Sequence, residues 1–227
     1  MDNVMPLPLQ VEDRQGPVGG VEDLRLKRRA LELEHIEAWL RGGRFKKEQI
    51  LRTFLRAGLW LTGLRSRGEQ NALNPVIREM RFEFDTLPEA FSGFKILHLS
   101  DLHIDGQDGL AENICRQIRG LEVDLCVLTG DYRFEASGPS HDVYRNMEKI
   151  LGSINARCGT VGILGNHDFM EKVPELERMG VRMLVNEALE LRNGQESVWL
   201  VGLDDPYHYG CDDLPGALAG VPDNAFK

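Results

Sequence analysis

The sequence has few cysteines and lacks any long stretch without charge. Its four cysteines are scattered and form no Cys-x-x-Cys pair, which excludes a disulfide scaffold and a cysteine-based zinc module. The longest run without a charged residue, 158 to 167, is about half of what a helix needs to cross a bilayer. No secretory signal peptide is recognisable. These absences predict a cytoplasmic protein with reduced cysteines and no membrane span.

Charge is distributed unevenly along the chain. The net charge is -9, yet residues 24 to 67 hold 12 basic and 4 acidic side chains, whereas residues 96 to 227 hold 22 acidic and 11 basic ones. The 227 residues suffice for one catalytic domain with an appendage. An excess of carboxylates suits a domain that binds cations, although most of these carboxylates are expected on a solvated surface.

The N-terminal third predicts an appendage of helices. Residues 1–23 are rich in Pro, Gly and acidic residues and predict a flexible tail. Residues 24–70 predict a basic amphipathic helical region, with a second helix over 46 to 64. In the first helix, Gly42-Gly43 supplies a stop, and apolar residues recur at steps of three and four: Leu26, Ala30, Leu33, Ile36 and Leu40.

Residues 75–227 predict a catalytic domain of the α/β class. Alternating apolar residues over 76 to 84 predict a strand. Short apolar runs predict four further strands, buried on both faces, at 94 to 99, 123 to 128, 160 to 164 and 198 to 203. Helical patterns lie between them at 109 to 120, 141 to 156 and 171 to 179. Alternation of strand and helix indicates a sheet with its site at the carboxyl ends of the strands.

Three polar segments follow three of these strands: Asp101-Leu-His103, Gly130-Asp131, and Gly165-Asn166-His167-Asp168. Asp101 and His103 are two residues apart, so on extended backbone their side chains share a face and can reach one ion. The two carboxylate oxygens of Asp131 can bridge a pair of metals roughly 3.5 to 4 Å apart. Asn166 offers a neutral oxygen to the second ion. The segments therefore predict a dinuclear metal site.

The same segments predict a proton donor. His167 follows Asn166 directly and could donate a proton to a leaving oxygen, with Asp168 orienting its imidazole. We therefore assign His167 and Asp168 as the candidate catalytic residues.

Taken in order, the three segments resemble the first signature blocks of the calcineurin-like metallophosphoesterases. The resemblance implies a four-layer α/β/β/α sandwich in which Asp101 and His103 bind the first metal, Asp131 bridges and Asn166 binds the second. It also implies that His167 assists the leaving group. Two divalent ions are implied, and mixed Asp, Asn and His ligation favours Mn, Fe or Mg over a thiolate-selected metal.

The chain also departs from the family pattern. Many members place an acid where this chain has Phe134. The family's later blocks, a His after another strand and a Gly-His-x-His segment, do not occur before Lys227, so we expect the catalytic domain to be incomplete at its C-terminal side. The segment Gly202-Leu-Asp204-Asp205-Pro206 resembles one in a bacterial branch of the family, but the residues give Asp204 and Asp205 no role.

The resemblance predicts a hydrolase that cleaves a phosphomonoester, phosphodiester or pyrophosphate bond through a hydroxide activated by the two metals. A non-catalytic scaffold that keeps the fold, and a nuclease, are the alternatives. The basic helix 44–67 could dock on the catalytic domain or contact a membrane surface or lipid headgroup, which would make the protein peripheral at the membrane. Nucleic acid is disfavoured as a partner because the catalytic domain is acidic.

Overall fold

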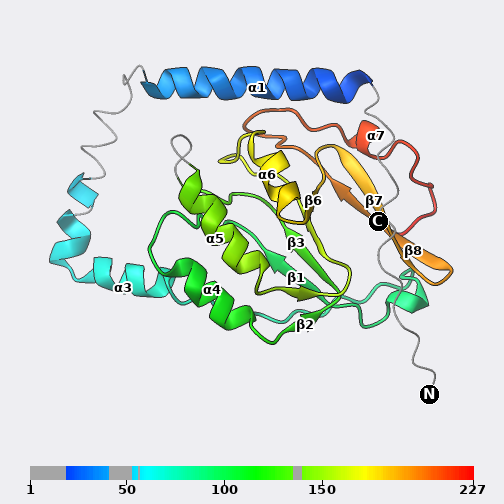
Figure 1. The fold of residues 1–227 in the computed structure, drawn as a ribbon, viewed down its shortest axis with the longest axis horizontal. Helices are drawn as coiled ribbons and strands as arrows, with labels where there is room; N and C mark the ends of the chain where they lie inside the picture. The colour runs from blue at the N-terminus through cyan, green and yellow to red at the C-terminus, as the bar shows by residue number, and fades with distance from the viewer. Residues whose placement is uncertain (1–18, 41–52, 56, 135–139) are drawn as a thin grey trace.

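The computed structural model describes residues 19–40, 53–55, 57–134 and 140–227 (Figure 1). Its centre is a four-stranded parallel sheet with the strand order β1-β3-β5-β6. The strands are β1 (Ile96–Leu99), β3 (Leu125–Leu128), β5 (Thr160–Gly162) and β6 (Val181–Met183). Helices α4 (Leu110–Ile118), α5 (His141–Leu151) and α6 (Lys172–Arg178) connect them. The predicted α/β class is confirmed.

Two smaller sheets flank the central one. Strands β2 (Glu122–Val123) and β4 (Asn155–Ala156) form a short parallel pair. Strands β7 (Glu187–Asn193) and β8 (Glu196–Gly202) form an antiparallel hairpin, followed by α7 (Leu214–Ala217). A short 3-10 helix, η1 (Glu89–Phe91), precedes β1. In the described part of the chain, no helix combines the length and apolar composition that a membrane crossing requires.

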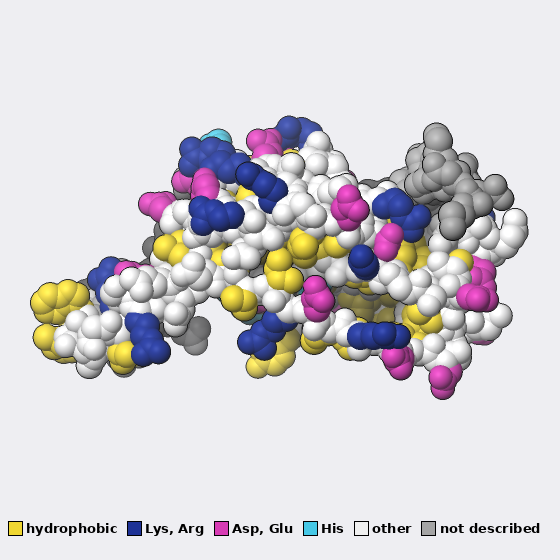
Figure 2. Space-filling model, turned by 90° about the horizontal axis from the view of Figure 1, so that it is seen from below, with side chains coloured by type: hydrophobic (Ala, Val, Ile, Leu, Met, Phe, Trp, Pro, Cys, Tyr) yellow, Lys and Arg dark blue, Asp and Glu magenta, His cyan; other side chains and the backbone are white. Residues whose placement is uncertain are grey.

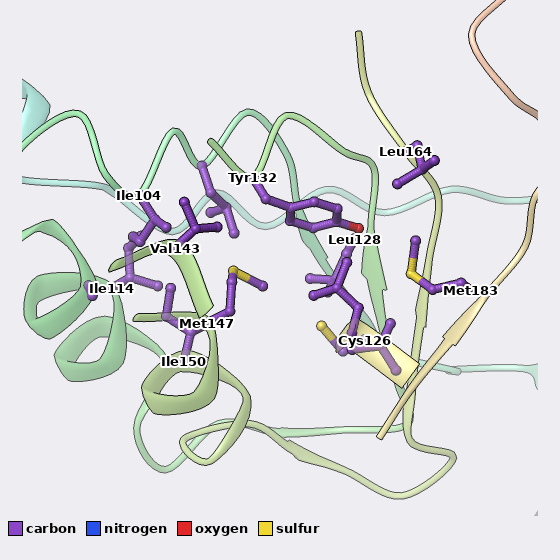
Figure 3. Close-up of a cluster of buried hydrophobic side chains, with 14 of the residues drawn as sticks. Ile104, Ile114, Cys126, Leu128, Tyr132, Val143, Met147, Ile150, Leu164 and Met183 are labelled. Atoms are coloured by element: carbon purple, nitrogen blue, oxygen red, sulfur yellow. The ribbon is translucent and has the colours of Figure 1, made fainter. Parts of the chain in front are cut away.

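Strands β3, β5 and β6 of the central sheet are largely buried, which explains their nearly continuous apolar sequences. The edge strand β1 was also predicted to be buried on both faces, and this is wrong: its side chains alternate between exposed and half-buried, and Ile96 is 53% exposed. On one face, Cys126 and Leu128 of β3 pack with Ile114 of α4 and Met147 of α5 (Figure 3). On the other face, Leu125 belongs to a second cluster that includes side chains of the hairpin β7–β8. The described residues thus form three layers: the helices, the parallel sheet and the β7–β8 hairpin. The predicted fourth layer stays a prediction.

Two other predicted strands also differ from the structure. The run 198 to 203 does form β8, but β8 pairs antiparallel with β7 instead of joining the parallel sheet. The alternating run 76 to 84 is assigned no strand, and its apolar side chains are exposed, among them Val76, Met80 and Phe82. Alternation alone could not predict a strand here, because a strand also needs a hydrogen-bonded neighbour.

The N-terminal region is helical where it is described. Helix α1 (Gly19–Leu40) starts inside the segment predicted as tail, and most of that tail lies outside the described residues. The predicted second helix, 46 to 64, is described only in part: 53–55 and 57–61 are helical, and α3 (Leu64–Ala72) follows. The regularly spaced apolar residues of α1 do not form its buried face: Leu26 and Leu33 are 59% and 62% exposed, whereas Arg28 is 0% exposed.

The cysteines agree with the prediction of reduced packing residues. All four are free thiols: Cys115, Cys126 and Cys211 are buried, and Cys158 is half-buried. Burial raises the pKa of Cys126 to about 12. A thiol in this environment stays protonated at neutral pH and behaves as a small apolar side chain.

Candidate metal centre

The parallel register of β1 and β3 brings the first two ligand segments together. Leu99 lies opposite Leu128 at the ends of the two strands. Beyond them the backbones continue to pair: Asp101 N donates to Gly130 O at 3.2 Å, and His103 N donates to Asp131 O at 3.0 Å. Asp101, His103 and Asp131 therefore meet at the carboxyl edge of the sheet, where the sequence placed them.

These three side chains fit a divalent cation. One potential ligand atom from each lies within 4.8 Å of the others, and the donors are carboxylate oxygens and an imidazole nitrogen. His103 Nδ1 lies 2.7 Å from the carbonyl oxygen of Arg133. A carbonyl only accepts, so Nδ1 carries the hydrogen and Nε2 keeps its lone pair for a metal. His103 Nε2 lies 3.8 Å from Asp131 Oδ2.

The backbone at the three positions is strained. Asp101, His103 and Asp131 have φ angles of 51°, 40° and 54°, a region that side chains other than glycine rarely adopt. Strain of this kind persists only where the surrounding structure enforces it, and it concentrates at functional sites. Three of the four non-glycine residues with positive φ in the described part of the chain are the candidate ligands, and the fourth is Asn186.

The third segment approaches from the end of β5. His167 N donates to Asp131 Oδ1 at 3.0 Å. The two carboxylate oxygens of Asp131 thus point in different directions, Oδ2 toward His103 and Oδ1 toward the loop of Asn166 and His167. Asn166 is exposed on this loop. The ring centroids of His103 and His167 are 5.1 Å apart, so all three predicted segments converge on one place.

Two glycines permit this convergence. Gly130 has a φ of 87°, and a Cβ there would overlap the backbone of Gly165. A Cβ at Gly165 would overlap the carboxylate of Asp131. The glycines of the Gly-Asp and Gly-Asn-His-Asp segments are thus needed because two loops meet with no room for a side chain.

Asp168 does not orient His167, contrary to the prediction. Its carboxylate is fully buried and accepts hydrogen bonds from the backbone N–H groups of Asp131 at 2.7 Å, Tyr132 at 3.2 Å and Gly165 at 3.0 Å. Burial raises its pKa. Asp168 therefore fastens the β3 loop to the β5 loop. The imidazole of His167 instead places Nδ1 3.0 Å from the carbonyl oxygen of Phe134.

Ion pairs that no sequence pattern indicated lie beside the third segment. Arg28 of α1 forms a buried ion pair with Asp204, with Nη1 2.5 Å from Oδ1. Asp204 belongs to the Gly202–Pro206 segment, whose carboxylates had no assigned role. The two residues are 176 positions apart, and neither periodicity nor motif could have paired them.

The fold and the site together define an α/β protein with a candidate metal centre at the carboxyl edge of its parallel sheet. Comparison with known families names the class: the sequence model described as calcineurin-like phosphoesterase matches residues 94–211. The chain belongs to this family. The finer assignment to a bacterial branch stays a prediction.

Several curated proteins are similar to the chain. A Bacillus subtilis protein named uncharacterized metallophosphoesterase YkoQ is 31% identical over 134 residues, which cover 53% of the chain and 46% of that protein. The UDP-2,3-diacylglucosamine pyrophosphatase LpxG of Chlamydia muridarum is 35% identical over 104 residues, 44% of the chain and 31% of that protein. A transmembrane protein with metallophosphoesterase domain from Danio rerio is 24% identical, covering 70% of the chain and 37% of that protein.

The chain thus spans less than half the length of each of these relatives. No solved structure matches it at a significant level.

Proposed function

We propose that this chain carries the active site of a metal-dependent phosphoesterase. The observation that supports this most strongly is the convergence of Asp101, His103 and Asp131 within 4.8 Å at the ends of two neighbouring strands. In the proposal, Asp101 and His103 would hold one ion, Asn166 would hold a second, and Asp131 would contribute to both. Two divalent ions, Mn, Fe or Mg, would supply Lewis acidity and lower the pKa of water at this edge of the sheet.

Asn166, His167 and Asp168 would each have a separate role in the reaction. Asn166 contributes a neutral ligand and so leaves less negative charge to repel a phosphate. His167 donates its Nδ1 hydrogen to Phe134 O, since a carbonyl only accepts, and this leaves Nε2 to hold the proton that a leaving oxygen needs. Asp168 keeps the two loops in register through its three backbone contacts.

Among the three candidate bonds we favour a pyrophosphate linked to a lipid. The Chlamydia muridarum relative is named as a UDP-2,3-diacylglucosamine pyrophosphatase. A direct test compares the metal-loaded protein on 4-nitrophenyl phosphate, bis(4-nitrophenyl) phosphate and UDP-2,3-diacylglucosamine. Preferred cleavage of the third supports the pyrophosphatase assignment, and no hydrolysis of any of them contradicts the proposed activity.

Substitution of His167 tests its role as proton donor. We expect His167→Ala to lower kcat by roughly 100-fold or more on an alkyl phosphate ester, whose leaving oxygen needs a proton. On a 4-nitrophenyl ester, which departs without one, we expect a loss below about tenfold. Kinetics on both esters at saturating Mn²⁺ measure the difference, with His141→Ala on α5 as control. Equal losses on the two esters would rule out proton donation by His167.

The proposal includes contact with a membrane surface through the helical segment before and within α3. Figure 2 shows apolar and basic side chains together at the projecting end of the molecule. Apolar side chains that are at least half exposed gather there: Phe54, Leu55, Trp60, Leu61 and Leu64. Arg65 and Arg67 are exposed beside them. Apolar side chains next to arginines are typical of helices that lie on anionic lipid. The part of 44–67 that precedes residue 53 lies outside the described residues.

Vesicle sedimentation tests this contact. We expect the full chain to pellet with vesicles of phosphatidylglycerol and phosphatidylcholine, and less with phosphatidylcholine alone. The triple variant Phe54→Ala, Trp60→Ala, Leu61→Ala should bind at least about tenfold more weakly, because it loses most of the apolar surface available for insertion. Met80→Ala, which alters a side chain that is 75% exposed elsewhere, is the control. Undiminished pelleting of the triple variant would contradict the contact.

A further inference from the structure

Helix α1 packs on the catalytic domain through its charged side chains. Arg28 is 0% exposed and Glu32 is 6% exposed, while the apolar Leu26 and Leu33 face outward. Figure 1 shows α1 along the outside of the domain, beside the loops around α6 and α7. Burial of a guanidinium is tolerated only when hydrogen bonds and opposite charge replace its water. The contacts of Arg28 therefore show which part of the domain α1 binds.

Arg28 uses all three of its guanidinium nitrogens. Nε donates to Glu32 Oε1 at 3.0 Å, and Nη1 donates to Asp204 Oδ1 at 2.5 Å. Nη2 donates to two backbone carbonyls of the third ligand segment, Asp168 O at 2.7 Å and Gly165 O at 3.1 Å. The guanidinium also stacks on a ring from the segment after β8, with its carbon 3.6 Å from the centroid of Tyr209.

Neighbouring contacts fasten the rest of the same loop. Glu32 Oε1 accepts a hydrogen bond from Met170 N at 2.9 Å, and Tyr209 OH donates to Asn166 O at 3.4 Å. On its other side the loop is fixed to β3 through Asp168 and through the contact of His167 N with Asp131. The segment from Gly165 to Met170 is thus held between α1 and the loop after β3.

We propose that Arg28 is a positioning residue for the metal centre: it fixes the Gly165–Met170 loop so that Asn166 and His167 face Asp131. Asp204 orients the guanidinium, which gives the Gly202–Pro206 segment a role. Helix α1 lies outside residues 94–211, the region that matches the family. In this proposal, α1 nevertheless helps to shape the metal centre. The assignment of Asn166 and His167 as ligand and proton donor rests on the proposed function, but the clamp itself does not.

Hydrogen exchange in the metal-free chain tests the clamp independently of activity. Arg28→Lys keeps the charge but loses the planar fork that reaches Asp204 and two carbonyls together. We expect the amides of His167 and Asp168 to exchange at least about tenfold faster in this variant, through local opening of the loop. Arg25→Ala is the matched control, because Arg25 lies on the same helix as Arg28 but pairs with Glu187 of β7, at 2.7 Å, instead of with the loop.

A compensated variant separates positioning from folding. Arg28→Met combined with Glu32→Gln and Asp204→Asn removes the buried charges together, so that no single charge is left without a partner. Its carbonyl contacts at Gly165 and Asp168 are lost. If the loop amides of the folded variant are as protected as in the wild type, the clamp is overturned. Faster exchange confined to the loop supports it, whereas a uniform increase over all amides shows only general destabilisation and overturns it.

Manganese titration of the same proteins connects the clamp to the site. We expect Arg28→Lys to weaken binding of the second ion, through Asn166, by about tenfold and to leave the first ion at Asp101 and His103 unchanged. Equal affinities for both ions in Arg28→Lys and wild type would overturn the positioning role. If the wild type bound no Mn²⁺, the proposed function would fail, and the exchange experiment would still decide the clamp.

Discussion

Replacing Asp131 with alanine should lower kcat/KM on bis(4-nitrophenyl) phosphate by at least roughly a thousandfold, because both ions of the proposed site depend on it. Its Oδ2 lies 3.8 Å from His103 Nε2, and its Oδ1 accepts the hydrogen bond from His167 N at 3.0 Å. Loss of this side chain removes the bridge and also frees the third ligand segment. Steady-state kinetics in excess Mn²⁺ measure the effect.

Asp142 supplies the control for this substitution. It is an exposed carboxylate on α5, paired with Arg145 at 2.7 Å. We expect Asp142→Ala to keep activity within about twofold of the wild type, since surface ion pairs contribute little. If Asp131→Ala hydrolysed the diester as fast as Asp142→Ala does, Asp131 could not be the bridging ligand.

Replacing Gly130 with alanine should have the second largest effect, on stability and metal binding together. Its φ of 87° strains any side chain, and the added Cβ would overlap the backbone of Gly165. The strain and the forced shift together should cost about 3 to 5 kcal/mol, which lowers the Tm by roughly 10 °C. Separation of the two loops should also remove Mn²⁺ binding.

Gly120 provides a closely matched control for Gly130. Its φ is 82°, but a Cβ there meets nothing within 4 Å. Gly120→Ala should therefore carry the backbone strain alone, about 1 to 2 kcal/mol, and keep its metal. Thermal unfolding and metal binding of the two variants measure the difference. If both variants lost similar amounts of Tm and both kept their metal, the close approach of the two loops would not be the reason for a glycine at position 130.

The convergence of the three candidate metal ligands could be predicted from sequence because each of them follows a strand. Parallel strands end at one edge of a sheet, so Asp101, His103 and Asp131 had to come close once β1 and β3 were recognised. The role of Asp168 was harder to predict. Its position next to His167 suggested contact between the two side chains, whereas burial turned the carboxylate toward backbone N–H groups.

The buried face of helix α1 could not be predicted from the sequence pattern. Apolar spacing correctly predicted that α1 is a helix, but the apolar residues Leu26 and Leu33 at that spacing are exposed. The structure buries Arg28 instead, because Asp204 and the loop carbonyls supply partners from more than a hundred residues away. Periodicity describes one helix, and these partners come from the tertiary fold. The same holds for 76 to 84, where the alternating pattern is present but no strand of the described residues pairs with it.

Equilibrium dialysis of the full chain against Mn²⁺, followed by elemental analysis, tests the dinuclear centre most directly. We expect two equivalents of manganese per wild-type chain and the loss of both in Asp131→Ala, because one carboxylate bridges the two ions. A folded wild-type chain that binds no metal, or an Asp131→Ala variant that keeps both ions, would contradict the proposed centre.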